Sequence, residues 1–243
     1  MAYHNKSKHI KTRGQNNRIS LLYITKDKKP NTSWVKKCPI IDEIIIGDEN
    51  QYPLKDNFSQ KRNKLVQKAK NKWVLFLDTD EIPSDKLIEF LNHFDTNQYK
   101  NFAIKRIDYF FNKALLFGDT GNFYVTRLIL KKHGEFINPV HEIWQSKLPT
   151  QKIKQAIYHY PHQSIKEFLN KINKYSDIRS RQLFQQKHKS NLIQIIFYPL
   201  AKFIHLYFVK LGIFDGIHGL IFALLMSYYS FLVRAKLWHI SLQ

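Results

Sequence analysis

The sequence predicts an α/β protein with a mixed sheet and an apolar helical region at its C-terminus. Three features of the chain support this fold class. Apolar β-branched runs alternate with helical patterns up to residue 100, further strand-like runs follow, and residues 191–243 are the most apolar part of the chain. Because strands that alternate with helices usually pair in parallel, we expect a parallel first half of the sheet and an antiparallel or mixed second half.

Three apolar runs in the first half predict buried strands. They are residues 18–26, 41–50 and 72–78. The stretch SWVKKC between the first two is long enough for only a turn or two of helix. Leu65, Val66 and Ala69 recur at helical spacing, which predicts a helix over residues 58–70 before the third strand.

Another helix follows the third strand. Ser84 is a suitable N-cap for the run DKLIEFLNHF, and Pro83 precedes it. After residue 100 the strand-like runs are NFAIKRIDYFFN, NFYVTRLILKK, EFINPVHEIW and KIKQAIYHY. From Ser164 the pattern becomes helical again.

The composition limits the class of protein. A chain of 243 residues with 44% hydrophobic residues can form one large domain, or one domain with an appendage. Its net charge of +20 predicts a polyanionic neighbour: nucleic acid, an anionic lipid surface or a phosphorylated substrate. The single cysteine, Cys38, excludes an internal disulfide and a cysteine-based zinc site. The polar and basic residues 1–17 do not have the pattern of a signal peptide, and we interpret them as a flexible basic arm.

Carboxylates gather where the predicted parallel strands end. Asp48 follows the second strand, and Asp78, Asp80 and Glu81 follow the third. Open α/β sheets bind ligands beyond the carboxyl ends of their strands, so these acids are candidate site residues. Asp78 and Asp80 suit Mg²⁺ or Mn²⁺ shared with a substrate diphosphate. The alternative is a capping role near the next helix, which explains Asp80 and Glu81 but not Asp78.

An apolar strand followed by Asp-x-Asp is also typical of haloacid-dehalogenase-type phosphatases. In that family the motif follows the first strand, and Thr or Val stands where this chain has Ile82. The family also needs a downstream acid pair. No two acids after Glu81 are adjacent, and Phe123 stands where a Gly-Asp-x-x-x-Asp motif would need its last acid. We therefore exclude this class.

Several segments, in this order along the chain, resemble a known family. They are ITK, DEIIIGD, FSQKRNKLVQKAKNKWVLFLDTDE, RLILKK, VHE and LGIFDGIHGLIFALLMSYYSFLVRAKLW. Together they resemble glycosyltransferase family 2, in the branch of lipopolysaccharide-core β-glucosyltransferase-like proteins. The resemblance covers roughly residues 18 to 240 and implies a GT-A fold, a nucleotide-sugar donor and inversion at the anomeric carbon.

The resemblance also implies roles for single residues. Asp48 would face the nucleotide base, Asp78 would lie near the ribose, and Asp80 would bind the metal that bridges the diphosphate. Arg127 matches the family's "RL" position and would pair with a diphosphate or an acceptor phosphate. The matched "VHE" segment supplies His141 and Glu142. The chain departs from the family pattern after Asp48 and before the "RL" segment, where donor-base contacts and acceptor specificity would be set.

Inverting transfer needs one base to deprotonate the acceptor hydroxyl. Glu142 is the preferred candidate, since it lies downstream of the metal motif, in the half that should bind the acceptor. Asp119 and Glu81 are its competitors, and His141 and Asp119 are acceptor-side candidates. His141 would orient the base, bind the acceptor or only pack.

Residues 191–243 combine apolar runs with interrupting charges. Lys202 and Lys210 break the first run, and Pro199 is expected to prevent a continuous ideal helix there. The second run is flanked by basic residues and is shorter than the roughly 20 residues of a spanning helix. Dense aromatic residues with Lys and Arg are typical of interfacial helices. We therefore expect two helices around the Phe214-Asp215-Gly216 turn, lying on the cytoplasmic side of the cell membrane as a peripheral or monotopic element. Packed core, a dimer interface and a transmembrane hairpin are the alternatives.

The predicted organisation follows from these points. It comprises a basic arm (1–17), a GT-A catalytic domain (18–163), a connecting helix (164–190) and a membrane-interface region (191–243). The leading hypothesis is a metal-assisted inverting transferase that moves a hexose from a nucleotide-sugar donor, a UDP-hexose, to a lipid-linked, lipopolysaccharide or cell-envelope glycan acceptor at an anionic membrane. The alternatives are a degenerate sugar-binding scaffold and a basic nucleic-acid-binding protein. No nucleic-acid-binding motif occurs in the sequence, so we expect no nucleic acid partner.

Overall fold

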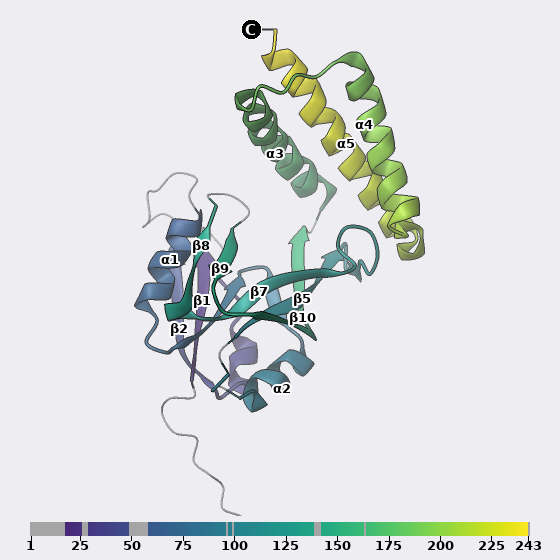
Figure 1. Ribbon diagram of the computed structural model, residues 1–243. Helices are drawn as coiled ribbons and strands as arrows, with labels where there is room; N and C mark the ends of the chain where they lie inside the picture. Colours follow the sequence, from purple (N-terminus) through teal and green to yellow (C-terminus); the bar gives the residue numbers. More distant parts are fainter. Residues whose placement is uncertain are drawn as a thin grey trace, which may run out of the picture. The chain divides into compact units, whose positions relative to one another are not determined.

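Figure 1 shows the computed structural model of the chain. The structure describes residues 18–25, 29–48, 58–95, 97–98, 100–138, 142–162 and 164–242. It divides into two compact units that interleave along the chain. Unit 1 comprises Met1–Thr79, Asp85–Ala103 and Thr126–Gln151; unit 2 comprises Asp80–Ser84, Ile104–Val125 and Lys152–Gln243.

The main sheet is mixed, as the sequence predicts. Its strands are hydrogen-bonded in the order β2-β1-β3-β7-β5-β10-β4, and β6 pairs with β5. β1 (Ile19–Thr25) pairs in parallel with β2 (Ile41–Asp48) and β3 (Trp73–Asp78), whereas β7 (Phe123–Leu130) pairs antiparallel with β3. The predicted α/β class and the change from parallel to antiparallel pairing are both confirmed.

The parallel strands of unit 1 end at the same edge of the sheet. Thr25 of β1 is paired with Asp48 of β2, and Ile24 is paired with Asp78 of β3. The connections are a short 3-10 helix, η1 (Ser33–Lys37), and the helix α1 (Phe58–Lys68), as the sequence predicts. The strand register therefore brings the backbones of two predicted site residues to one edge.

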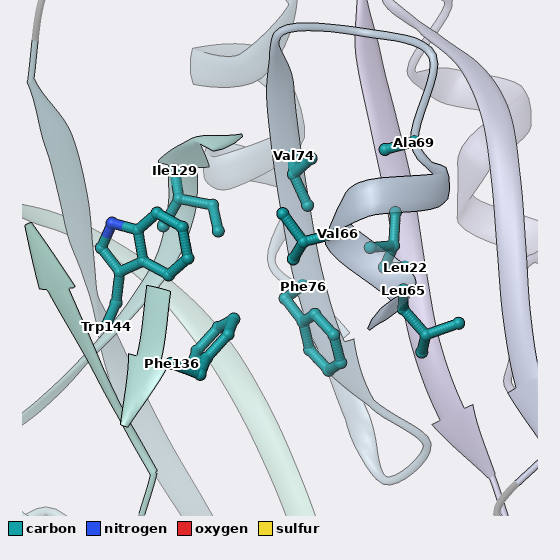
Figure 2. Packing of buried hydrophobic residues seen from close by; sticks show 9 residues of the cluster. All are labelled: Leu22, Leu65, Val66, Ala69, Val74, Phe76, Ile129, Phe136 and Trp144. Atoms are coloured by element: carbon teal, nitrogen blue, oxygen red, sulfur yellow. The ribbon is translucent and has the colours of Figure 1, made fainter. Parts of the chain in front are cut away.

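The core of unit 1 packs α1 against the sheet (Figure 2). Its buried members are Leu22, Leu65, Val66, Ala69, Val74, Phe76, Ile129, Phe136 and Trp144. Phe136 lies between Phe76 and Trp144, with ring centroids 5.7 and 5.1 Å away. It comes from the hairpin of β8 (Gly134–Ile137) and β9 (Ile143–Ser146), a stretch that the sequence predicts as a single strand run. The hairpin is therefore part of the core of unit 1.

The helix α2 (Asp85–His93) also belongs to unit 1 and is preceded by Ser84, as predicted. It buries Leu87, Ile88 and Leu91. Beyond its end, Phe94 contacts Trp73 edge to face at 5.1 Å. The apolar positions of DKLIEFLNHF thus form the buried face of the helix.

Unit 2 contains strands that the sequence predicts only in part. β5 (Asn101–Phe110) and β10 (Thr150–His162) match the predicted runs, but β4 (Glu81–Pro83) and β6 (Lys113–Ala114) are not predicted. β4 pairs antiparallel with β10, with Glu81 opposite His159. Three residues carry too little sequence pattern to identify a strand, so β4 is defined by its partner rather than by its own composition.

The C-terminal part of unit 2 consists of helices. α3 (Ile165–Gln185) begins at Ser164, whose side chain accepts the Glu167 N–H at 3.1 Å. α5 (Ile217–Ile240) packs against both α3 and α4 (Leu192–Ile204), and the three run side by side in Figure 1. α3 and α5 share a hydrophobic cluster with the end of β5 and the residues that follow it. The cluster includes Phe110, Leu115, Phe168, Ile172 and Phe222.

Pro199 lies inside α4 and does not end it, which differs from the expected interruption. The Ser227 hydroxyl of α5 donates to the Pro199 carbonyl at 2.7 Å. After α4 the chain widens into a π-helical turn, η4 (His205–Val209), and continues into the short helix η5 (Gly212–Asp215). The predicted pair of helices around the Phe214-Asp215-Gly216 turn is confirmed.

Two stretches of this region are long and apolar enough to cross a membrane by length and composition. They are Leu192–Val209 and Ile217–Ile240. No residue of α4 is buried, and Leu192, Ile193 and Phe197 each expose more than 60% of their surface. An apolar surface of this extent on a monomer indicates a partner or a membrane.

The fold predicts a strong dependence on Trp73. This side chain is fully buried among Phe94 and Phe102, so Trp73→Ala should lower the free energy of unfolding by about 3–5 kcal/mol. The matched control is Trp238→Ala, because Trp238 is 44% exposed and its loss should cost about 1 kcal/mol or less. Urea unfolding of both variants in lipid-free buffer tests this. Equal losses would contradict the assigned core.

Candidate functional site

The end of β3 carries a charged cluster within unit 1. One carboxylate oxygen of Asp78 accepts a hydrogen bond from Arg62 Nη2 at 3.0 Å, and the other pairs with Arg127 Nη2. The side chains of Arg62 and Arg127 are only 11% and 7% exposed. Two buried guanidinium groups therefore fix the orientation of this carboxylate.

The helix α1 places Arg62 on its buried face. Its guanidinium lies over the Phe76 ring at 4.4 Å and near the Phe136 ring at 5.4 Å. Its Nη1 is buried and has no hydrogen-bond partner among the described residues. A buried donor without an acceptor costs about 1–3 kcal/mol, so a ligand oxygen at this position would be favoured.

Glu142 lies next to Arg62. Its Oε1 is 3.8 Å from Arg62 Nε, and its side chain is 15% exposed. Within unit 1, Arg62 thus contacts the predicted base Glu142 and the predicted donor-binding residue Asp78, and Asp78 in turn contacts Arg127. His141 lies outside the described residues, and so does the side chain of Asp48.

A second charged cluster lies within unit 2, around His159 of β10. Nδ1 of His159 is 2.7 Å from an Asp108 oxygen, and Nε2 is 3.6 Å from an Asp80 oxygen. Arg106 Nε lies 3.0 Å from Asp108. The Asp80 backbone is also fixed, because its carbonyl accepts the Tyr160 N–H at 2.8 Å. His159 therefore lies between two carboxylates.

These contacts shift two pKa values. Burial lowers the pKa of His159, but its hydrogen bonds with Asp108 and Asp80 outweigh burial and raise it to about 9. Burial raises the pKa of Asp108, yet His159 and the positive charge of Arg106 outweigh it and the net pKa is lowered. At neutral pH the cluster thus contains an imidazolium ion between two carboxylates.

The competing base candidates have different surroundings. The Glu81 side chain is fully buried, with Arg106 Nη1 4.0 Å away. Asp119 lies in the loop between β6 and β7 and forms an ion pair with Lys202 of α4 at 2.7 Å. Burial keeps the Glu81 carboxylate out of reach of a substrate hydroxyl, whereas the Asp119 side chain is 40% exposed.

Among the described residues, no group of three or more His, Cys, Asp and Glu side chains is arranged to hold a metal ion. A metal shared with a substrate diphosphate does not need such a cage, since one or two protein ligands suffice. Asp80 and His159 supply an oxygen and a nitrogen within unit 2. Asp108 on the far ring nitrogen is the usual partner of a metal-binding histidine.

The sequence does not single out Arg62, Arg106, Asp108 or His159. A signal for them exists nevertheless. Arg62 lies three and four residues before two buried helix positions, and Arg106 and Asp108 share a strand face with the buried Ile104. Charged residues at inward positions of an apolar pattern are expected at functional sites.

The mixed sheet, the acids after the parallel strands and the apolar C-terminal helices define a GT-A-like Rossmann fold. Curated relatives agree with this class. The chain is 26% identical over 191 residues to an uncharacterized glycosyltransferase of Rickettsia bellii, covering 72% of this chain and 64% of that protein. Uncharacterized glycosyltransferases of Rickettsia prowazekii and Rickettsia conorii are 25% and 26% identical over 71% of this chain. They support glycosyl transfer in general.

The chain spans a little under two thirds of the length of these relatives, from 64% to 66%. No family model matches the sequence.

The His159 cluster predicts a pH-dependent stability. A pKa raised from 6.5 to about 9 in the folded state stabilises the protein fully below pH 6.5, and this contribution is lost as the pH rises through 9. The total is about 3 kcal/mol, and His159→Gln should abolish it. Urea unfolding across this pH range measures the effect, with His93→Gln at an exposed helix end as control. If the free energy of unfolding changed with pH in the same way in wild type and His159→Gln, the ion pairs of His159 with Asp80 and Asp108 would be refuted.

Proposed function

We propose that the protein is an inverting glycosyltransferase that moves a hexose from a nucleotide-sugar donor to a lipid-linked or cell-envelope glycan acceptor. The observation that carries this proposal is the Asp78 carboxylate fixed by Arg62 and Arg127 at the end of β3. It lies where α/β sheets bind ligands, and the similarity to proteins named glycosyltransferases supports the same class.

The donor would be a uridine diphosphate hexose. Both oxygens of Asp78 are held by arginines, so it would accept hydrogen bonds from the ribose hydroxyls at low entropic cost. The buried Nη1 of Arg62 would donate to a donor oxygen, and Arg127 would contribute positive charge beside the diphosphate. Asp48 would contact the base, as the family resemblance implies.

A divalent cation, Mn²⁺ or Mg²⁺, would be held by Asp80. When bound, it would neutralise charge that develops on the leaving diphosphate. Both oxygens of Asp78 already contact arginines, which favours Asp80 as the ligand. His159 would be a second ligand after loss of its proton, with Asp108 retaining the Nδ1–H hydrogen bond.

The transfer itself is a direct displacement. The acceptor hydroxyl oxygen forms a bond to the anomeric carbon while the bond from this carbon to the donor phosphate oxygen breaks. The nucleoside diphosphate leaves with the electron pair, and Glu142 takes the hydroxyl proton. Arg62 would orient Glu142, because its Nε lies 3.8 Å from the carboxylate.

The apolar surface of α4 and α5 supports a membrane location for this reaction. It exposes large aliphatic and aromatic side chains, and the chain carries a net charge of +20. Basic side chains near an anionic bilayer each contribute on the order of 1 kcal/mol of binding. A cytoplasmic-face, peripheral or monotopic location would give the enzyme access to a lipid-linked acceptor.

The metal assignment predicts a binding defect. Asp80→Asn should weaken Mn²⁺-dependent binding of uridine diphosphate by about tenfold or more, because a neutral amide is a poor ligand for a hard cation. Isothermal titration calorimetry with and without Mn²⁺ measures it. Asp177→Asn, an exposed acid of α3, is the matched control. Equal Mn²⁺-dependent affinity in both variants would place the metal elsewhere.

The base assignment predicts a separation of binding from turnover. Glu142→Gln keeps the size of the side chain but cannot accept the proton, so transfer should fall by about a hundredfold or more while uridine diphosphate binding persists. Glu135→Gln on the neighbouring strand β8 is the control, because Glu135 is exposed. Undiminished turnover in Glu142→Gln would assign the role to another acid such as Asp119.

A further inference from the structure

Asp215 is a buried acid that the proposed chemistry does not use. It is 3% exposed and lies at the end of η5, between η4 and α5. Its two carboxylate oxygens accept the backbone N–H groups of Leu116 and Phe117, each at 3.0 Å. Lys113 Nζ donates to its backbone carbonyl at 3.1 Å. One side chain thus connects the η5 turn to the loop between β6 and β7.

Glycines allow the turn to close around this acid. A Cβ on Gly219 would collide with the Gly212 carbonyl and lie 3.0 Å from the Asp215 Cβ. Gly216 has φ of +65°, which other residues adopt at a cost. The spacing of these residues in GIFDGIHG is therefore what orients Asp215 toward the loop.

Three further contacts join the same segments. The Gly118 N–H donates to the Lys210 carbonyl at 2.9 Å, and the Phe117 and Phe214 rings lie 5.5 Å apart. The third is the ion pair of Asp119 with Lys202 of α4. Lys202 of α4, Lys210 after η4 and Phe214 of η5 therefore all contact the loop between β6 and β7. The loop and the η5 turn are thus packed together as one local substructure.

The loop between β6 and β7 and the η5 turn together present an apolar surface. Leu116 of the loop is 54% exposed, and the turn contributes Leu211, Ile213, Phe214 and Ile217, which are 44–68% exposed. We call Leu116, Phe117 and these four residues the docking edge. Lys113 and Lys210 flank it and are exposed. Apolar side chains bordered by cations complement the interface of an anionic bilayer.

We propose that the docking edge inserts into the membrane interface, so that the β6–β7 loop and the C-terminal helices meet the bilayer together. This inference rests on the proposed membrane association and names the contact surface. A spanning position of α4 is disfavoured, because the ion pair of Lys202 with Asp119 would have to enter the hydrocarbon or break. In this arrangement Asp215 is a positioning residue, and Asp119 lies at the lipid surface, next to the acceptor.

The first experiment labels the loop. Leu116→Cys with an environment-sensitive nitrobenzoxadiazole dye reports burial in lipid. The native Cys38 is buried, and desolvation raises its pKa to about 11, so it will not compete for the label. On vesicles of phosphatidylglycerol and phosphatidylethanolamine, dye emission should shift to shorter wavelength and increase about twofold or more. The same dye on Lys154→Cys, an exposed position of β10, should not respond.

The second experiment breaks the connection. Leu116 and Phe117 donate to different oxygens of Asp215, so in Asp215→Asn one of the two N–H groups would face an NH₂ group in place of an acceptor. Amide hydrogen exchange at Leu116 and Phe117 should accelerate by about tenfold or more, and the vesicle-induced dye response should fall. Flotation on the same vesicles should persist, since the helices keep their apolar surface. Asp177→Asn should match the wild type in all three measurements.

The outcomes separate this inference from the proposed function. Flotation without a dye response at Leu116 would overturn the docking edge and leave membrane association intact, whereas loss of flotation would overturn both. A dye response without vesicles, accompanied by a doubled molar mass in light scattering, would assign the edge to a second copy of the chain. Absence of glycosyl transfer would leave the vesicle results unchanged.

Discussion

The charge on Arg62 and Arg127 is the constraint on which the structure of unit 1 depends. Both guanidinium groups are nearly buried, and Asp78 compensates them at the end of β3. Removing one partner of a buried ion pair typically costs 3–5 kcal/mol, because the other charge stays buried. The carboxylate at the strand end is therefore structural: it orients two guanidinium groups and is oriented by them.

Asn63, the residue after Arg62, connects α1 to the strand β8. Asn63 donates to the Phe136 carbonyl at 2.9 Å and accepts the Phe136 N–H at 2.7 Å. Two adjacent residues of α1 thus connect the helix to β3 and to β8. The strand β8, which precedes Glu142 in sequence, is thus held by the same helix turn that contacts Asp78. These local contacts give the proposed donor-binding region a fixed framework.

Much of the fold is predictable from the sequence because burial sets its periodicity. Three parallel strands, α1, α2, α3 and the pair of C-terminal helices all carry apolar spacing that matches their structure. β4 and the division into β8 and β9 are not predictable, since short strands depend on a partner distant in sequence. Pro199 misleads because a proline removes one helical hydrogen bond without having to end the helix, and α4 continues past it to Ile204.

The candidate site is only partly predictable. Acids at strand ends are visible in sequence, as Asp78 and Asp80 show. Their partners are not, because Arg62 and His159 come from a helix and a strand whose relation to these acids depends on tertiary packing. Inward-facing charges in apolar patterns indicate that such partners exist, but sequence spacing alone does not pair them.

The hydrogen bonds of Asp215 have a consequence for how the C-terminal region can be studied. Removal of residues 191–243 would leave the Leu116 and Phe117 amides without their carboxylate acceptor. It would also expose Phe110, Leu115 and Phe168, because these side chains pack against α5. Such a fragment would aggregate through newly exposed core, and its behaviour would resemble membrane attachment in a sedimentation assay. Point substitutions on the outer surface of α4, where no side chain is buried, keep that core intact.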